Sequence, residues 1–178
     1  MNMPQLLLEW FRPKAFQKPA PKAGARQSRP KRQHRPIDDR YDELVRTMLE
    51  RYQLRVRKWW TSMSGVAWEV HYHDGSVARL IEAPRPRGPM SAAVFLHEVG
   101  HHAIGLSTYK PRCLEEYHAW AWSLRELEAN GFNVTDRVRA RMAQSLAYAV
   151  YKARKRGLKR LPRELEPFTP ERVFSQKP

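Results

Sequence analysis

Cysteine is nearly absent from this chain, because Cys113 is the one cysteine among 178 residues. A single cysteine excludes an internal disulfide and a zinc site built from several thiolates. A metal site in this protein must therefore use histidine and carboxylate side chains as ligands. The scarcity of cysteine is also typical of a protein from a reducing compartment.

Long hydrophobic runs are lacking as well. No apolar stretch approaches the roughly 18 residues of a transmembrane span. The apolar residues between Gln5 and Phe11 are too few, and wrongly flanked, for a signal peptide. We therefore expect a cytoplasmic protein that does not bind a membrane. Its length of 178 residues suits one domain with a proper core and additional tails.

Acidic residues are missing from two segments that carry most of the positive charge. Residues 12–36 hold nine Lys or Arg and five Pro, and residues 152–163 hold seven Lys or Arg. The rest of the chain has 17 basic and 18 acidic residues, so the net charge of +15 comes from these segments. Such segments either bind phosphate backbones without sequence preference or serve only solubility.

The chain is expected to form an α+β domain over residues 37–160. Residues 1–36 should be a basic, Pro-rich and largely disordered arm, because proline breaks regular structure and few apolar residues are present. Residues 161–178 contain Pro162, Pro167 and Pro170 and are expected to form a C-terminal tail. No internal repeat is present.

Secondary structure is predicted from the spacing of apolar residues. Helical spacing after Asp38 and Asp39 predicts a first helix. Three short segments rich in β-branched and aromatic residues follow: Leu54–Trp60, Val66–Tyr72 and Val77–Ala83. Asp74-Gly75 predicts a tight turn between the last two, so we expect a small antiparallel sheet.

Helices are predicted for most of the remaining chain. The apolar stretch Ser91–Leu106, with Ser91 as its N-cap, is the first of them. Cys113–Ala129 should form the next helix, closed by Asn130-Gly131. A long C-terminal helix capped by Thr135 or Asp136 follows.

The first of these three helices contains an HExxH motif, His97-Glu98-Val99-Gly100-His101. Residues four apart lie on one helix face, so the imidazoles of His97 and His101 can bind one metal ion. Glu98 lies off this axis, where its carboxylate can act as a base rather than as a ligand. The alternative is a helix with two ordinary histidines, but buried paired histidines need a partner. The motif therefore predicts a zinc hydrolase.

A third ligand is needed, because a catalytic zinc site normally takes three protein ligands and keeps one position for water. A small residue one turn after the ligand lets two helices approach closely. Ala119 follows Glu116 by three residues and Glu115 by four, so we select Glu116 and keep Glu115 as the alternative. Gly100 costs its helix about 1 kcal/mol relative to alanine, which favours a role in close packing against a neighbouring element.

These residues give the chain a resemblance to the gluzincin group of zincin metallopeptidases. Members have HExxH followed, on a later helix, by a glutamate ligand in an ExxA or ExxS context, here Glu116-Tyr117-His118-Ala119. The resemblance covers roughly residues 66–131 and extends to compact HExxH proteins of phages and bacteria, including the ImmA/IrrE type. Many gluzincins have an aspartate four residues after this glutamate, where the present chain has Trp120. The group that orients a histidine is therefore expected elsewhere.

The resemblance implies a minimal zincin-like core and a zinc-dependent metallopeptidase with one Zn²⁺ per chain. Ligands would be His97, His101 and Glu116, and Glu98 would be the general base for a zinc-activated water. The substrate would be a protein or peptide, paired with Val77–Ile81 as the edge strand. The alternative is a zincin-fold protein that binds DNA or RNA nonspecifically through its basic segments, with proteolysis secondary or lost.

Overall fold

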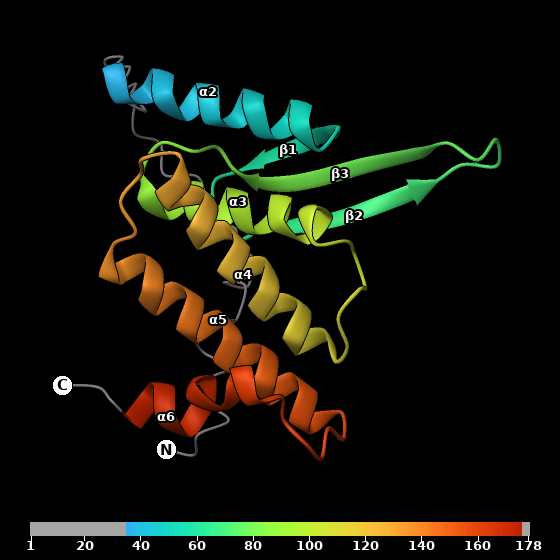
Figure 1. The fold of residues 1–178 in the computed structure, drawn as a ribbon, viewed down its shortest axis with the longest axis vertical. Coiled ribbons are helices and arrows are strands. Elements are labelled where there is room, and N and C mark those ends of the chain that lie inside the picture. Colours follow the sequence, from blue (N-terminus) through green and yellow to red (C-terminus); the bar gives the residue numbers. More distant parts are fainter. Residues whose placement is uncertain (1–34, 176–178) are drawn as a thin grey trace, which may run out of the picture. The chain divides into compact units, whose positions relative to one another are not determined.

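The structure is a computed structural model that describes residues 35–175. Predictions about residues 1–34 and 176–178 lie outside the described residues. The predicted α+β class is confirmed (Figure 1). In chain order, the elements are α2 (Pro36–Arg51), β1 (Leu54–Trp60), β2 (Val66–His71), β3 (Val77–Pro84), α3 (Pro89–Ala103), α4 (Arg112–Ala129), α5 (Asp136–Lys155), the short 3-10 helix η1 (Arg163–Phe168) and α6 (Pro170–Ser175).

Helix α2 begins at Pro36, whose missing N–H and fixed φ suit the first helical position. The Asp38 carboxylate accepts hydrogen bonds from the backbone N–H of Arg35 at 3.0 Å and from its guanidinium at 3.2 Å. The helix therefore starts slightly before the aspartates from which it was predicted. Its apolar residues Tyr41, Leu44 and Met48 are buried in the core.

The sheet has the strand order β1-β3-β2 and is mixed. The predicted hairpin is confirmed, because β2 pairs antiparallel with β3 around a turn in which Gly75 has φ +82°. However, β1 pairs parallel with β3, so the prediction of an antiparallel sheet is wrong for this pair. The chain reverses direction between β1 and β2 and again between β2 and β3, so β3 runs parallel to β1. In space, β3 lies between β1 and β2. The prediction of an edge strand at Val77–Ile81 is therefore also wrong, since β3 is central.

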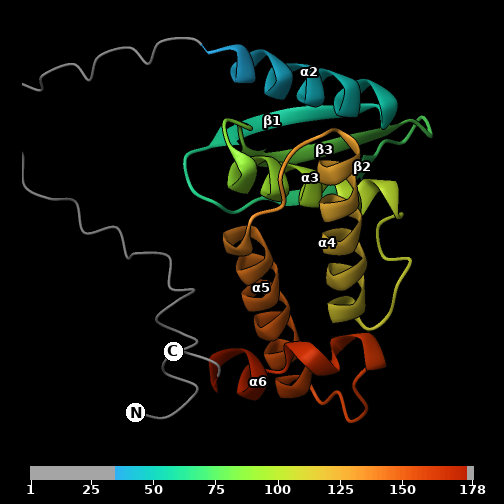
Figure 2. The same ribbon diagram turned by 60° about the vertical axis from the view of Figure 1, so that its left-hand side comes forward.

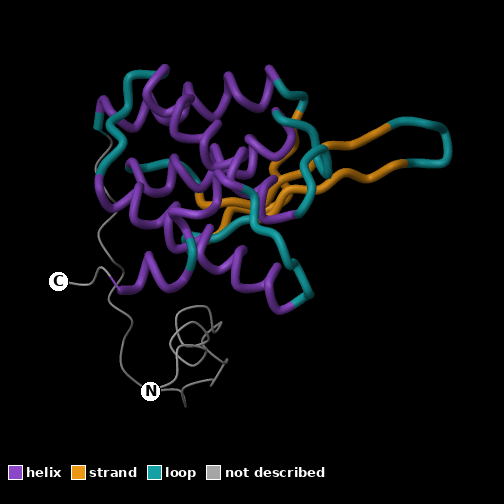
Figure 3. The backbone as a smooth tube through the Cα atoms, turned by 60° about the horizontal axis from the view of Figure 1, so that its bottom comes forward, coloured by secondary structure: helices purple, strands orange, loops and turns teal. Residues whose placement is uncertain are grey.

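Helices pack on both sides of this sheet. In both ribbon views, α2 lies on one side of the strands and α3 on the other (Figures 1 and 2). α4 packs against α3, and α5 against α4. Phe95 and Leu96 of α3 and Ile81 of β3 are fully buried in the core between these layers. The tip of the β2–β3 hairpin extends beyond the helices (Figure 3).

Residues 161–175 belong to the same compact unit as the domain, although they were expected to form a tail. They form η1 and α6, which pack against α5. Leu165 of η1 is fully buried in the core, and Pro170 at the start of α6 is also buried. Within residues 35–175, no helix is long and apolar enough to cross a membrane.

Candidate metal centre

The HExxH motif lies in the second half of α3, where every residue from Ser91 to His102 is buried. This helix begins earlier than predicted, because Gly88 is its N-cap and Pro89 its first residue. Ser91 instead lies in the first turn, where its hydroxyl accepts a bond from the Arg87 N–H at 2.9 Å and donates to the Gly88 carbonyl at 3.0 Å. The helix ends at Ala103, earlier than the predicted Leu106, just before Gly105 adopts φ +84°.

Close packing between α3 and α4 brings the two halves of the site together. A Cβ atom on Gly100 would lie 2.8 Å from the backbone oxygen of Ala119, so only glycine permits this approach. One turn after Ala119 on α4, the buried Ser123 hydroxyl donates to the carbonyl of Ala93, which lies two turns before Gly100 on α3, at 2.7 Å. The packing roles predicted for Gly100 and Ala119 are confirmed. Glu116, one turn before Ala119, consequently faces α3.

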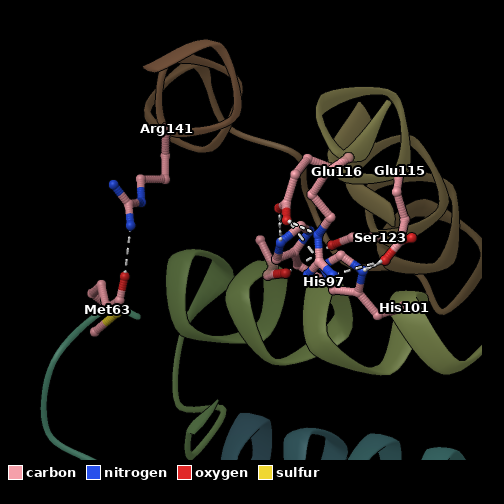
Figure 4. A network of polar contacts seen from close by, with 9 residues as sticks. Met63, His97, His101, Glu115, Glu116, Ser123 and Arg141 are labelled. Carbon is pink, nitrogen blue, oxygen red and sulfur yellow. Dashed lines mark hydrogen bonds and ion pairs between the residues drawn. The ribbon is translucent and has the colours of Figure 1, made fainter. Parts of the chain in front are cut away.

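Three side chains converge at this contact: His97, His101 and Glu116 (Figure 4). Oε2 of Glu116 lies 3.3 Å from Nε2 of His97 and 3.6 Å from Nε2 of His101. One ligand atom from each residue lies within 4.8 Å of the other two. Two atoms bonded at about 2.1 Å to one tetrahedral ion are about 3.4 Å apart. The group can therefore hold a metal ion without rearrangement of the helices.

Arg112, the first residue of α4, fixes the orientation of Glu116. Its Nε lies 3.1 Å from Oε1 of Glu116, which leaves Oε2 directed at the histidines. Burial alone would raise the pKa of Glu116, but hydrogen bonds from His101 and His97 outweigh burial and hold that pKa well below its usual range. Glu116 is therefore a carboxylate, as a metal ligand must be.

Glu115 occupies a different position from Glu116. Its Oε1 lies 3.2 Å from Nδ1 of His101, on the ring nitrogen that does not face Glu116. The Glu115 side chain is fully buried. The structure therefore gives Glu115 the role of orienting His101, the role for which the sequence offered no residue. Trp120, the residue at the position of the missing aspartate, instead stacks on His97 with ring centroids 4.4 Å apart.

Replacing Glu115 with alanine should lower the affinity of the site for a divalent metal ion about 10- to 100-fold, because His101 would lose the acceptor that fixes its ring. Glu115→Gln should lose less, since its amide oxygen can still accept the Nδ1 proton. Competition with a chromophoric chelator measures both affinities. Equal affinity in the wild type and Glu115→Ala would show that His101 needs no such partner.

The two histidines have opposite electrostatic environments. Burial lowers the pKa of His97 to about 4, even though Glu116 contacts it. Burial also acts to lower the pKa of His101, but hydrogen bonds to Glu115 and Glu116 outweigh it and raise that pKa to about 9. His97 is therefore neutral, whereas a metal ion that bound here would have to displace a proton from His101.

Glu98 lies next to this group, and its side chain packs against the loop between β1 and β2. A Cβ atom on Gly65 would lie 2.6 Å from Cγ and 2.8 Å from Oε1 of Glu98. Burial raises the pKa of Glu98 to about 8. A cation bound by the neighbouring histidines would favour its charged form. Sequence reasoning did not identify Gly65, although a glycine just before a strand is a signal of close approach.

Two other histidines have structural environments. Nε2 of His102 lies 3.1 Å from the Leu80 carbonyl oxygen of β3, so this histidine links α3 to the sheet. His118 stacks on Tyr109 with ring centroids 3.9 Å apart. Within residues 35–175, His97, His101 and Glu116 are the group whose geometry suits a metal ion.

The local geometry thus joins the HExxH helix and the glutamate helix into one candidate metal centre. His97, His101 and Glu116 come together as the motif predicts, and Glu98 lies beside them. No family model matches this sequence, and neither a curated protein nor a solved structure shows significant similarity to it.

Proposed function

We propose that the protein is a zinc-dependent metallopeptidase. The observation that carries the proposal is the convergence of His97, His101 and Glu116 within 4.8 Å, with Glu98 adjacent to the first histidine. Two imidazoles and one carboxylate are a common ligand set for catalytic zinc, and three protein ligands leave a position for water. The lack of thiolate ligands is consistent with a catalytic rather than a structural site.

The residues around the site would divide the work of peptide hydrolysis. Bound zinc would supply Lewis-acid polarisation of a water molecule and of the scissile carbonyl. Glu98 would accept the proton of the attacking water and deliver it to the leaving amine nitrogen. Arg112 would hold Glu116 in place, and Glu115 would hold the ring of His101. A buried base and rigid ligands favour this chemistry because little reorganisation is needed.

The edge of β2 is the best candidate for binding an extended peptide. β3 is hydrogen-bonded on both sides, whereas within the described sheet β2 pairs only with β3. β2 begins at Val66, directly after the glycine that packs against Glu98. A peptide that adds to this free edge would therefore run toward Glu98.

Metal removal provides the test of the proposed activity. Zinc-loaded protein should cleave an unfolded protein or a broad peptide library. Dialysis against a chelator should abolish cleavage, and one equivalent of zinc should restore it. Cleavage that survives complete removal of the metal would contradict a zinc peptidase. An absence of cleavage by zinc-loaded protein across the library would favour a zincin-like fold without proteolytic activity.

Nonspecific binding of DNA or RNA is a second candidate function, supported by the exposed basic end of α5. Lys152, Arg154 and Lys155 lie in its last turns, and the chain continues with further exposed basic residues up to Arg163. Arg154 forms an ion pair with Glu171 of α6 at 3.3 Å. Lys155, Arg156, Lys159 and Arg160 are exposed and form no ion pair with a described residue. Cations of this kind bind phosphate groups, whose counterions are then released.

Substituting Lys155, Arg156, Lys159 and Arg160 with glutamine should weaken binding to duplex DNA of any sequence. The slope of log affinity against log salt should become shallower by about 0.9 for each lost phosphate contact. Fluorescence anisotropy at several salt concentrations measures both. An unchanged slope would mean that this segment does not contact nucleic acid and that its charge serves another purpose, such as solubility.

A further inference from the structure

Arg141 of α5 extends toward the loop that covers Glu98. Its Nη2 donates a hydrogen bond to the Met63 carbonyl at 2.9 Å, across 78 positions of sequence (Figure 4). Met63 is two residues before Gly65, which packs directly against Glu98. Arg141 therefore brings a positive charge to the side of the metal centre on which Glu98 and the start of β2 lie.

The guanidinium of Arg141 has unused hydrogen-bonding capacity. It carries five N–H donors, and the Met63 carbonyl is its hydrogen-bond acceptor within residues 35–175. Its Nε is buried and has no partner there. Leaving a buried donor unpaired costs about 1–3 kcal/mol. The guanidinium therefore keeps donors that a bound group with an acceptor oxygen could satisfy.

Arg141 also differs from the other arginine close to the site. Arg112 is engaged with Glu116 and lies 3.5 Å from Glu115, whereas Arg141 forms no ion pair with a carboxylate of the described residues. An unneutralised cation next to a hydrolytic site favours a negatively charged oxygen on the ligand.

We propose that Arg141 is a substrate-binding residue that donates hydrogen bonds to an anionic oxygen of the bound peptide. This inference rests on the proposed peptidase function. The oxygen has two possible sources with the same chemistry: the oxyanion that develops at the attacked carbonyl, and the C-terminal carboxylate of the peptide. The N–H groups of Nη1 and the second N–H of Nη2 are the donors available to it, while Nη2 keeps its hydrogen bond to the Met63 carbonyl.

Three uncleavable peptides of one sequence distinguish these sources when they bind to zinc-loaded, full-length protein. The first has a phosphinate in place of the scissile amide and an amidated C-terminus. The second has a neutral hydroxyethylene group there and a free C-terminal carboxylate. The third has the hydroxyethylene group and an amidated C-terminus, and so carries neither anion. Calorimetry measures each affinity in the wild type, Arg141→Met, Arg141→Lys and the control Arg137→Met, at an exposed position one turn earlier on α5.

Arg141→Met should weaken at least one anionic peptide tenfold or more and leave the neutral peptide within twofold of the wild type. Loss for the phosphinate identifies the oxyanion, and loss for the free carboxylate identifies the C-terminus. Arg141→Lys should recover part of the affinity, and Arg137→Met should match the wild type. Zinc content and melting temperature confirm that each variant is folded.

The proposal is overturned if Arg141→Met binds both anionic peptides as the wild type does. It is also overturned if all three peptides weaken equally, because Arg141 would then only hold the loop at Met63. In both cases the peptidase function is unaffected. If the proposed peptidase function is wrong, the wild type will bind no zinc, or will bind zinc but none of the three peptides. The role proposed for Arg141 would then be wrong as well.

Discussion

Glu98→Gln is expected to slow peptide hydrolysis by about 10²- to 10⁴-fold, the usual contribution of a general base, while the protein keeps its zinc. The amide has nearly the same size as the carboxylate, so it should fit the buried space beside Gly65. It cannot accept a proton from water. Glu98 does not belong to the group of side chains that can hold the metal, so zinc content should not change.

Initial rates on a fluorogenic peptide and zinc content by mass spectrometry test this prediction together. Glu128→Gln is a suitable control, because Glu128 is exposed on α4 and pairs with Arg139. The control should retain the wild-type rate. Equal rates for the wild type and Glu98→Gln would show that another group accepts the proton, whereas loss of zinc from Glu98→Gln would show that Glu98 acts on the metal site itself.

Gly100→Ala is expected to destabilise the protein by about 1–3 kcal/mol, the usual cost of inserting a methyl group into a packed core. Alanine has the better helix propensity by about 1 kcal/mol, so propensity alone predicts the opposite sign. The added Cβ would lie 2.8 Å from the Ala119 oxygen and 3.1 Å from Cε3 of Trp122. The backbone of α4 cannot yield as a flexible side chain would, so the two helices must move apart.

The same substitution should weaken zinc binding, because Glu116 is one turn from Ala119 on the displaced helix. Denaturant unfolding of metal-free protein measures the stability, and chelator competition measures the zinc affinity. Gly88→Ala is the control for zinc affinity, since a Cβ atom there meets nothing within 4 Å. Its effect on stability should be limited to the poorer N-cap that alanine makes for α3. A Gly100→Ala protein that is at least as stable as the wild type and binds zinc as tightly would refute the role given to this close approach.

Much of the fold could be predicted because it depends on local sequence. Thr135, one of two predicted caps, accepts a hydrogen bond from the Val138 N–H at 3.3 Å at the start of α5. The hairpin around Asp74-Gly75 forms with the expected pairing. These features involve residues close in sequence, whose backbone preferences act without the rest of the fold.

The features that sequence reasoning missed depend on tertiary packing. The position of β3 between β1 and β2 could not be predicted from the sequence of any one strand. The alternation of apolar and polar residues shows which face of a strand is buried, but not which strand lies beside it. Glu115 and Glu116 are adjacent in sequence, and only the placement of α4 on α3 decides which carboxylate meets Nδ1 and which meets Nε2. Arg141 reaches the loop beside Glu98 from α5, a helix far along the chain.

Metal analysis of the purified full-length chain tests the central claim most directly. The account predicts one zinc per chain in the wild type and none in His97→Ala or Glu116→Ala. Glu115→Ala should still fill at saturating zinc, with the lower affinity described above. Stoichiometric zinc in Glu116→Ala together with loss from Glu115→Ala would contradict the ligand assignment. A wild-type protein that binds no zinc would contradict the metal centre and the function proposed from it.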